Sequence, residues 1–505
     1  MMENNWLKDE DSGSSGPKEQ REPPFTGDNE ADDETLDRIY RKLDLRIIPP
    51  LWTLYFLCSA IRSNVGLAQT MNLKEHHDLG SVLHLTPRQI STSLALFYVC
   101  YIIFDLPSNL IMTRLSPHVW MSRIVISVGV IGALMAAVKA AWSLYLLRLL
   151  LGIVIAGMWP GMAYYLSLFY PPARTGQRIG FYFTAAQVSA AVVGLVSAGF
   201  QKMDGLGGLA GFQWMFLIWG LAGTLMGITL LWWLPDRPVP PGESHPPRSA
   251  WLRWIPNTKP ALSGRDEELH YADVQRVYKK VQWGWSDILR ILCDWRLWPV
   301  TIMYFGVVGV GIGVQSYGTV IIRAAIPSLT GVQLSLLFAP IWVMDLIAIL
   351  IMTPISDAFH HHRPAIFIFS CLILLTGLLL TTFTHTWTAY GGLLIVGFGL
   401  GPTVPITMSL TAELFGARYG DVGVAASTAI VSGLGNLGSI VSTYALYTGW
   451  EGDVKRGYRG SNGVMCGIVG GSIVAAVAVG MIVWGKQKEE QRGWRGVWWA
   501  KWLMK

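Results

Sequence analysis

Long hydrophobic blocks separated by short polar connections run through most of this chain. A helix needs about 20 apolar residues to cross the roughly 30 Å hydrocarbon core of a bilayer, because it rises about 1.5 Å per residue. Twelve blocks reach that length: 47–68, 89–112, 119–140, 142–169, 179–201, 212–234, 298–323, 331–356, 364–384, 387–411, 422–447 and 462–484. The pattern therefore predicts an all-α membrane protein with twelve transmembrane helices.

A polar stretch divides the predicted spans into two six-helix halves. It begins with several prolines and continues with a charged run from Arg265 to Lys280, so we expect a cytosolic loop that contains a short surface helix. In chain order we expect a disordered tail, a bundle, the loop, a second bundle and a basic, Trp-rich tail, with boundaries 1–45, 46–234, 235–296, 297–485 and 486–505. The last tail has the composition of a helix at an anionic lipid surface.

The composition supports a membrane protein and excludes a large soluble enzyme. Hydrophobic residues make up 52% of the chain and charged residues 14%, whereas a soluble domain carries roughly 25% charged residues. The net charge of +6 does not indicate a nucleic-acid partner, because most of the 39 Lys and Arg residues lie in tails and connections on one side of the predicted bundle. Basic connections face the cytosol, so we expect both termini to be cytosolic.

The sequence has no complete set of reactive or metal-ligating side chains. Its five cysteines are scattered, and the tract His360–His362 lacks a second cluster to complete a metal site, so we expect a solvated turn there. No GxxxxGK[ST] phosphate loop occurs, which disfavours ATP-driven transport. A membrane-embedded transferase would need clustered His, Asp or nucleophilic residues at a membrane face. We expect no metal, no cofactor and no enzymatic activity.

Two arginines, Arg62 and Arg148, lie inside predicted spans at similar depth. A buried arginine costs about 2.5 to 3.5 kcal/mol on insertion scales, so each should face the protein interior or a water-filled cavity. Two cations at one depth indicate an anion site. The alternative is that each pairs with a carboxylate or with backbone carbonyls and only holds the bundle together.

Asp345 is the carboxylate nearest the middle of a predicted span. A carboxyl group at that depth suits a site that takes up and releases protons, although it could equally pair with an arginine. Asp105 lies closer to the inner end of its span, where a gate is more plausible. Uncharged polar residues in the spans can hydrogen-bond a solute, although bonds between helices are commoner. These residues are Asn64, Gln187, Gln315 and Tyr317.

Several motifs narrow the class further. They include Asp105-Leu-Pro-Ser-Asn109 continuing through Arg114, Pro117, Trp120 and Arg123, together with Arg62-Ser-Asn64, Leu147-Arg148 and Gly435-Asn436-Leu-Gly438. With the six-plus-six plan, they resemble the major facilitator superfamily and, within it, the anion:cation symporter branch, the allantoate permease-like transporters common in fungi. The resemblance covers the chain from Arg41 to about Gly485.

The resemblance implies two related halves around a central site. It associates Arg148 with proton coupling. It also assigns Asp105, Asn109 and Arg114 to an inner-gate motif, whose second copy contains Asp357 and Arg363.

Three positions depart from this pattern. Ile61 stands where relatives commonly have Asp, Ala358 replaces a basic residue, and Asp345 stands where relatives have a small or apolar residue. We hypothesise that the acidic group has moved from the first span to the eighth.

These observations predict a multi-pass secondary transporter of a small organic anion, such as a carboxylate or a vitamin-like acid. We expect a monomer in the plasma membrane that couples anion symport to protons by alternating access. The substrate would contact Arg62, Asn64, Arg148, Gln187, Gln315 and Tyr317, and Asp345, Asp105 and Arg148 would carry the coupling. The alternatives are an exporter of a secondary metabolite and a nutrient sensor of the same fold that does not transport.

Overall fold

The computed structural model describes residues 29–238, 261–277, 285–359, 362–447, 450–454 and 456–503. Residues 1–28 of the predicted tail, together with His360 and His361, lie outside the described residues. The first half contains α1 (Asn29–Ala68), α2 (Leu79–Val82), α3 (Pro87–Arg114), α4 (Pro117–Leu134), α5 (Ala141–Ile155), α6 (Met158–Ser167), α7 (Pro172–Gln201) and α8 (Gly211–Trp233). The central loop contributes α9 (Arg265–Val277) and α10 (Trp285–Cys293).

The second half contains α11 (Leu297–Ala325), α12 (Gly331–Ala358), α13 (Arg363–Phe383), α14 (Thr386–Leu400), α15 (Thr403–Gly435), α16 (Leu437–Ile440), the π-helical turn η6 (Val441–Ala445), α17 (Glu451–Val454) and α18 (Arg459–Leu503). Within the described residues, nine helical stretches are long and apolar enough to cross a membrane. They coincide with nine of the twelve predicted spans. The remaining three predicted spans, 47–68, 89–112 and 422–447, are helical in α1, α3 and the stretch from α15 to η6.

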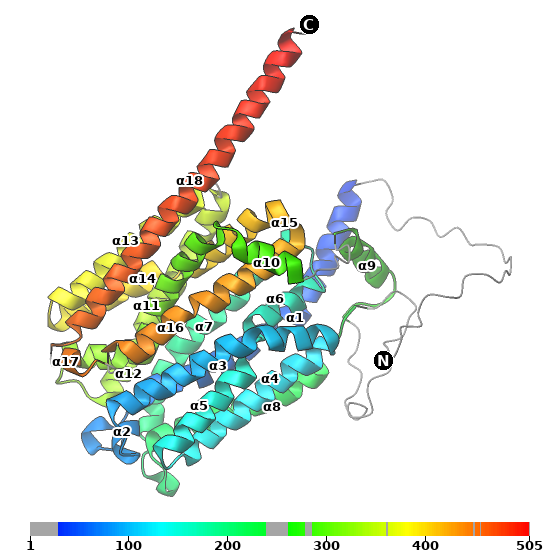
Figure 1. Cartoon of the computed structure of the whole chain (residues 1–505). Coiled ribbons are helices and arrows are strands. Elements are labelled where there is room, and N and C mark those ends of the chain that lie inside the picture. Colours follow the sequence, from blue (N-terminus) through cyan, green and yellow to red (C-terminus); the bar gives the residue numbers. More distant parts are fainter. Residues whose placement is uncertain are drawn as a thin grey trace.

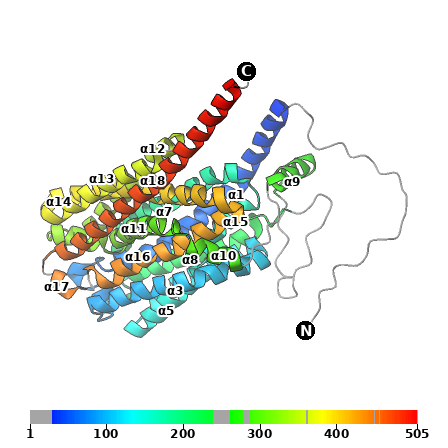
Figure 2. The same cartoon turned by 45° about the horizontal axis from the view of Figure 1, so that its top comes forward.

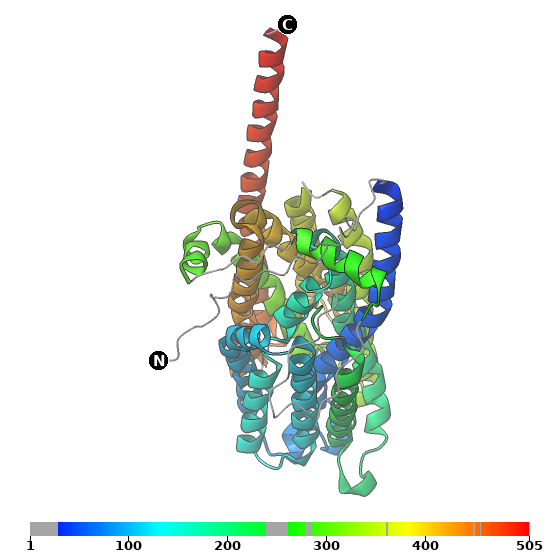
Figure 3. The ribbon, with the colours of Figure 1, turned by 90° about the vertical axis from the view of Figure 1, so that its right-hand side faces the viewer.

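The two halves lie side by side, with the blue-to-green helices of the first half on one side and the green-to-red helices of the second half on the other (Figures 1 and 2). Helix α7 packs against α12, and α1 packs against α11, so these pairs join the halves. The N-terminal part of α1 and the C-terminal part of α18 emerge from the same end of the bundle (Figure 3). We call this the tail end. The opposite end, which contains residues 66–91, 197–211, 315–335 and 441–447, is called the linked end.

One local expectation needs correction. Helix α1 begins at Asn29, whereas we expected disorder up to residue 45. The reason is an apolar face, spaced three or four residues apart, whose members Leu36, Ile39, Tyr40 and Leu43 are buried. Predicted span 4 is broken at Gly157, where φ is +79°. The basic, Trp-rich tail continues α18 straight beyond the bundle to Leu503 (Figure 1).

Candidate functional site

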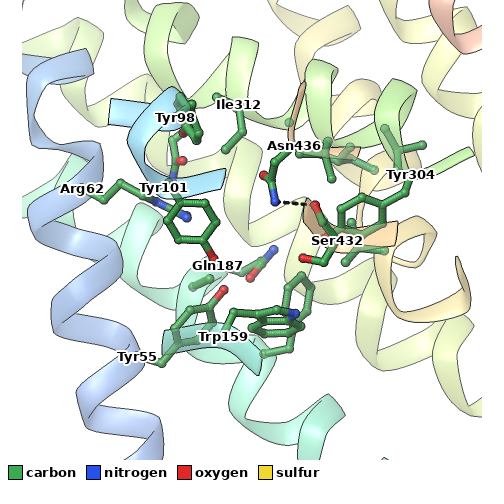
Figure 4. A pocket seen from close by; sticks show the side chains of 18 of the residues that line it. Tyr55, Arg62, Tyr98, Tyr101, Trp159, Gln187, Tyr304, Ile312, Ser432 and Asn436 are labelled. Atoms are coloured by element: carbon green, nitrogen blue, oxygen red, sulfur yellow. Dashed lines mark hydrogen bonds between the residues drawn. The ribbon is translucent and has the colours of Figure 1, made fainter. Parts of the chain in front are cut away.

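A cavity of about 130 Å³ lies between the two halves (Figure 4). Helices α1, α3, α5, α6 and α7 line it from the first half, and α11, α12, α14 and α15 line it from the second. Its polar and aromatic lining residues are Tyr55, Arg62, Phe97, Tyr98, Tyr101, Trp159, Phe183, Gln187, Tyr304, Gln315, Trp342, Asp345, Ser432 and Asn436. Four residues that we singled out from the sequence as site residues therefore meet here: Arg62, Gln187, Gln315 and Asp345.

Arg62 supplies the positive charge of the cavity wall. Its side chain reaches from α1 toward Tyr98 and Tyr101 (Figure 4). Tyr55 stands seven residues earlier on the same helix, which is two turns away and on the same face. The first half therefore presents a guanidinium group surrounded by tyrosine rings.

Arg148 lies behind this wall and does not line the cavity. It is 1% exposed, and its Nη1 donates a hydrogen bond of 3.3 Å to the backbone carbonyl of Arg62. Its guanidinium carbon is 5.8 Å from the ring centroid of Phe97, which does line the cavity. The two predicted cations are therefore neighbours, with Arg62 facing the cavity and Arg148 supporting it from inside the first half.

Asp345 projects into the cavity from α12 and is 1% exposed. The Gln187 amide of α7 faces it across the boundary between the halves, but no hydrogen bond of normal geometry joins them. Within the part of the chain that the structure describes, neither carboxylate oxygen has a hydrogen-bond partner and no ion pair includes Asp345. A Cβ atom on Gly401 would collide with the Asp345 carbonyl oxygen, so a glycine is required beside it.

Besides Arg148, two predicted substrate contacts lie outside the cavity. Asn64 is 1% exposed and does not line the cavity. Tyr317 is fully buried at the linked end, where its hydroxyl lies 3.0 Å from Ser91 Oγ and donates a 2.8 Å hydrogen bond to the Thr443 carbonyl. The structure therefore places Tyr317 in a contact between the halves, outside the cavity.

Further contacts join the halves at the linked end. Gln69 Nε2 donates to the Ser316 carbonyl at 3.1 Å, and Gln201 Nε2 donates to Ser335 Oγ at 3.0 Å. The helices also approach closely at Gly66, where an added Cβ would lie 2.7 Å from the Gln315 carbonyl oxygen. Neutral hydrogen bonds and a glycine contact thus hold the halves together here.

The predicted gate residues lie toward the tail end. Asp105 Oδ1 accepts a 2.8 Å hydrogen bond from the backbone N–H of Gly157, at the break between α5 and α6. Arg363 lies 2.8 Å from Asp357 and also pairs with Glu413, which joins α12, α13 and α15. Asn109 and Arg114 are on α3, but their side chains lie outside those that the structure describes.

Ile61 does not face the cavity. It is 2% exposed and packs against Gly132 of α4 and Gly223 of α8, which leave room for its side chain. An acidic group at position 61 would therefore lie inside the first half. Position 61 and Asp345 therefore do not belong to one site. The hypothesis that an acidic group moved from position 61 to position 345 does not describe a replacement within the cavity.

The aromatic lining was missed by our reading of the sequence. Tyr98, Tyr101 and Asp105 recur at intervals of three and four residues, which places them on one face of α3. That spacing is a usable signal for a polar face. Trp342 lies three residues before Asp345, which places both on one face of α12. Tyr304 carries no comparable signal, because tyrosines are also enriched at both membrane–water interfaces.

The fold and the cavity between two helical halves define a membrane transporter. The model of the Major Facilitator Superfamily matches residues 51–443, so the chain belongs to that superfamily and is a transporter rather than an enzyme. It is 46% identical over 453 residues to Vitamin H transporter 1 of Schizosaccharomyces pombe, covering 87% of this chain and 79% of that protein. It is 29% identical over 443 residues to a protein of Agrobacterium vitis named as a tartrate transporter, covering 87% and 93%.

A solved structure supports the fold. A bacterial homologue of the human lysosomal transporter Spinster, in an inward-facing and unoccupied conformation, matches with a TM-score of 0.59 and 16% identity. The match covers 86% of this chain and 96% of that one. At this identity the likeness shows the fold alone.

Proposed function

We propose that this protein is a proton-coupled symporter of a small organic anion, of the anion:cation symporter branch, and that it works by alternating access between its two halves. One observation carries the proposal: a cationic Arg62 and an acidic Asp345 line the same cavity from opposite halves. A group that binds an anion and a group that exchanges a proton would then share one site between two bundles, as coupled transport requires.

The anion would bind at Arg62. A guanidinium group donates two parallel hydrogen bonds to a carboxylate, and Arg148 adds a second positive charge behind it. The relatives support a carboxylate substrate, because vitamin H (biotin) and tartrate are both carboxylic acids. A carboxylate or vitamin-like acid is therefore the substrate class that we propose.

The proton would be carried by Asp345. Its carboxylate is buried without a counterion in the described part of the chain, and a buried, unpaired charge is costly enough for the group to exchange a proton during the cycle. Asp105 and Arg148 would assist this exchange. We propose that the tail end faces the cytosol, since basic connections gather there, and that the protein works as a plasma-membrane monomer.

The test is uptake of radiolabelled biotin, tartrate and other organic acids into proteoliposomes, with and without an imposed pH gradient. We expect Arg62→Gln to lower uptake by at least about tenfold, because a charge-assisted hydrogen bond contributes about 1.5–3 kcal/mol. Asp345→Asn should remove the dependence of accumulation on the pH gradient. Ser439→Ala is the control, since Ser439 is buried in α16 and does not line the cavity.

The outcomes separate the alternatives. Solute movement that is indifferent to the gradient in the unmodified protein would exclude both symport and proton-driven export. Accumulation driven in the opposite direction would indicate an exporter. Binding without any flux would indicate a sensor of the same fold.

A further inference from the structure

The α12 side of the cavity has an excess of hydrogen-bond acceptors without partners. Asp345 Oδ1, Asp345 Oδ2 and Gln187 Oε1 are buried, and none has a hydrogen-bond partner among the described residues. Asp345 is 1% exposed and Gln187 is 8% exposed, and both line the cavity. Buried acceptors are normally satisfied, so three unpaired acceptors on one wall point to a ligand that supplies the donors.

The opposite wall has the reverse character. Arg62 has only donor atoms, and its Nε is buried without a partner in the described part of the chain. A carboxylate on the ligand satisfies this group. The cavity therefore presents donors from α1 and acceptors from α7 and α12, so its charge distribution is that of a dipole.

Aromatic rings line much of the rest of the cavity. Tyr55, Tyr101 and Trp159 come from the first half, and Tyr304 comes from the second (Figure 4). The rings of Tyr55 and Trp159 are 5.6 Å apart, centroid to centroid. Such rings favour an apolar chain or a flat ring as the body of the ligand.

We infer that the cavity selects monocarboxylates that carry N–H donors at the opposite end, such as an amide, ureide or ammonium group, and rejects dicarboxylates. The carboxylate pairs with Arg62, and the N–H groups donate to Asp345 and Gln187. A second carboxylate at that end would face Asp345, and like charges brought together in a buried site repel strongly. Asp345 and Gln187 are then residues that determine specificity.

This inference rests on the proposed function only in taking the cavity as the substrate site. It is compatible with proton transfer at Asp345, because a carboxyl group keeps an acceptor oxygen whether or not it carries a proton. The inference also predicts that the cavity distinguishes biotin from tartrate, the two acids that the names of the relatives mention. Biotin has one carboxylate and a ureide at the far end, whereas tartrate has a carboxylate at each end.

The test uses four ligands of one chain length that differ only at the far end: caproate, adipamate, ε-aminocaproate and adipate. Their far ends are a methyl, an amide, an ammonium and a carboxylate group. Each is titrated by calorimetry into the purified full-length protein in detergent at about pH 8, where ordinary carboxyl groups are ionised. The amide and ammonium ligands distinguish a neutral N–H donor from a cationic one.

We expect at least one of adipamate and ε-aminocaproate to bind at least about tenfold more tightly than adipate. Asp345→Asn should reduce that ratio to about threefold or less, because the repelling charge is gone. Arg62→Gln should weaken all four ligands and keep their order. Thr319→Val is the control: Thr319 is buried on α11, has an unpartnered hydroxyl within the described residues and does not line the cavity, so the order should stay as in the unmodified protein.

Three results would overturn the inference: adipate binding as tightly as both N–H ligands, an unchanged ratio in Asp345→Asn, or no binding of any of the four at millimolar concentration. Calorimetry needs no flux, so the two proposals fail separately. A preserved ligand order without proton-driven uptake would contradict the proposed function and leave this inference standing. Proton-driven uptake without the expected ligand order would contradict this inference and leave the proposed function standing.

Discussion

The linked end and the tail end of the bundle use different chemistry. At the linked end, neutral hydrogen bonds cross between the halves, as from Gln201 to Ser335, and Gly66 allows the backbones to touch. At the tail end, the ion pairs among the described residues stay within one half or join a half to the central loop, as Lys42 does with Asp266. In the first half, Arg178 contacts both oxygens of Asp44 at 2.6 and 2.7 Å. In the second half, Arg363 joins Asp357 and Glu413.

The difference indicates which contacts would open if the two halves moved relative to each other. Interhelical hydrogen bonds in membrane proteins contribute about 0.6 kcal/mol on average, so a few of them can open at little cost. Ion pairs inside one half need not break when the halves rock against each other. The linked end therefore suits a gate that opens, and the tail-end pairs suit rigid halves.

The largest expected effect comes from Gly66→Ala. The added methyl group would lie 2.7 Å from the Gln315 carbonyl oxygen and 3.0 Å from that of Ser316, and backbone atoms cannot move aside. Overpacking of this kind costs about 1–3 kcal/mol, so we expect the equilibrium to shift about fivefold or more toward a state open at the linked end. Labelling of a cysteine introduced at Ser335 by a membrane-impermeant thiol reagent would measure that shift.

Gly199→Ala is the matched control, because among the described residues no atom outside its own helical backbone lies within 4 Å of the added group. It is also a helical glycine, on α7 near the same end. Equal labelling in the two variants would mean that the glycine contact does not control the linked end.

A smaller effect is expected from Arg363→Gln at the tail end. The Arg363 side chain is only 11% exposed, but its partners Asp357 and Glu413 are 60% and 45% exposed, so solvent screens both pairs. We expect a loss of about 1 kcal/mol in unfolding free energy. The midpoint of thermal unfolding of the purified protein measures it.

Arg418→Gln is the comparison for this variant. Arg418 is 51% exposed and lies 3.4 Å from Asp294, so its removal should cost less. An equal or greater loss in Arg418→Gln would show that the Arg363 cluster does not stabilise the second half in particular.

The smallest expected effect is a pH dependence at His270 on α9. This residue is 3% exposed, and its Nε2 donates to the Phe169 carbonyl at 2.7 Å, with Tyr40 and Asp273 nearby. Burial lowers the pKa of His270 below its ordinary value of 6.5, because desolvation disfavours the charged ring. The undocked helix α9 therefore binds more protons than the docked one. Docking of α9 should be strongest above pH 6.5 and should weaken as the pH falls below 6.5 and through the lowered pKa of His270.

The measurement is amide hydrogen exchange of residues 265–277 at about pH 7.5 and about pH 5.5, with the rates corrected for the intrinsic effect of pH on exchange. We expect faster exchange at the lower pH in the unmodified protein. His270→Gln keeps an N–H donor but does not titrate, so its corrected exchange should not change. The same acid response in both proteins would exclude His270 as the cause.

The charged residues of the site were predictable from the sequence because charge at lipid depth is costly. That cost required Arg62, Arg148 and Asp345 to face the protein interior, and all three are inside the bundle. Which of them share a cavity was not predictable, since helix spacing orders residues along one helix and leaves the rotation of that helix open. Arg148 supports Arg62, and Ile61 faces α4 and α8, because of how α1 is rotated within the first half.

Hydrophobic block length, the central polar stretch and the motifs were enough to establish a helical transporter of two halves, because bilayer thickness restricts the length and type of a spanning element. Block length, polar stretches and motifs are local features, because each can be recognised within a single segment of the chain. The approach of Gln187 to Asp345, the contact of Gly66 with Gln315 and the aromatic lining arise only when helices distant in sequence pack together. Contacts between halves depend on relative rotation and depth, which no one segment encodes.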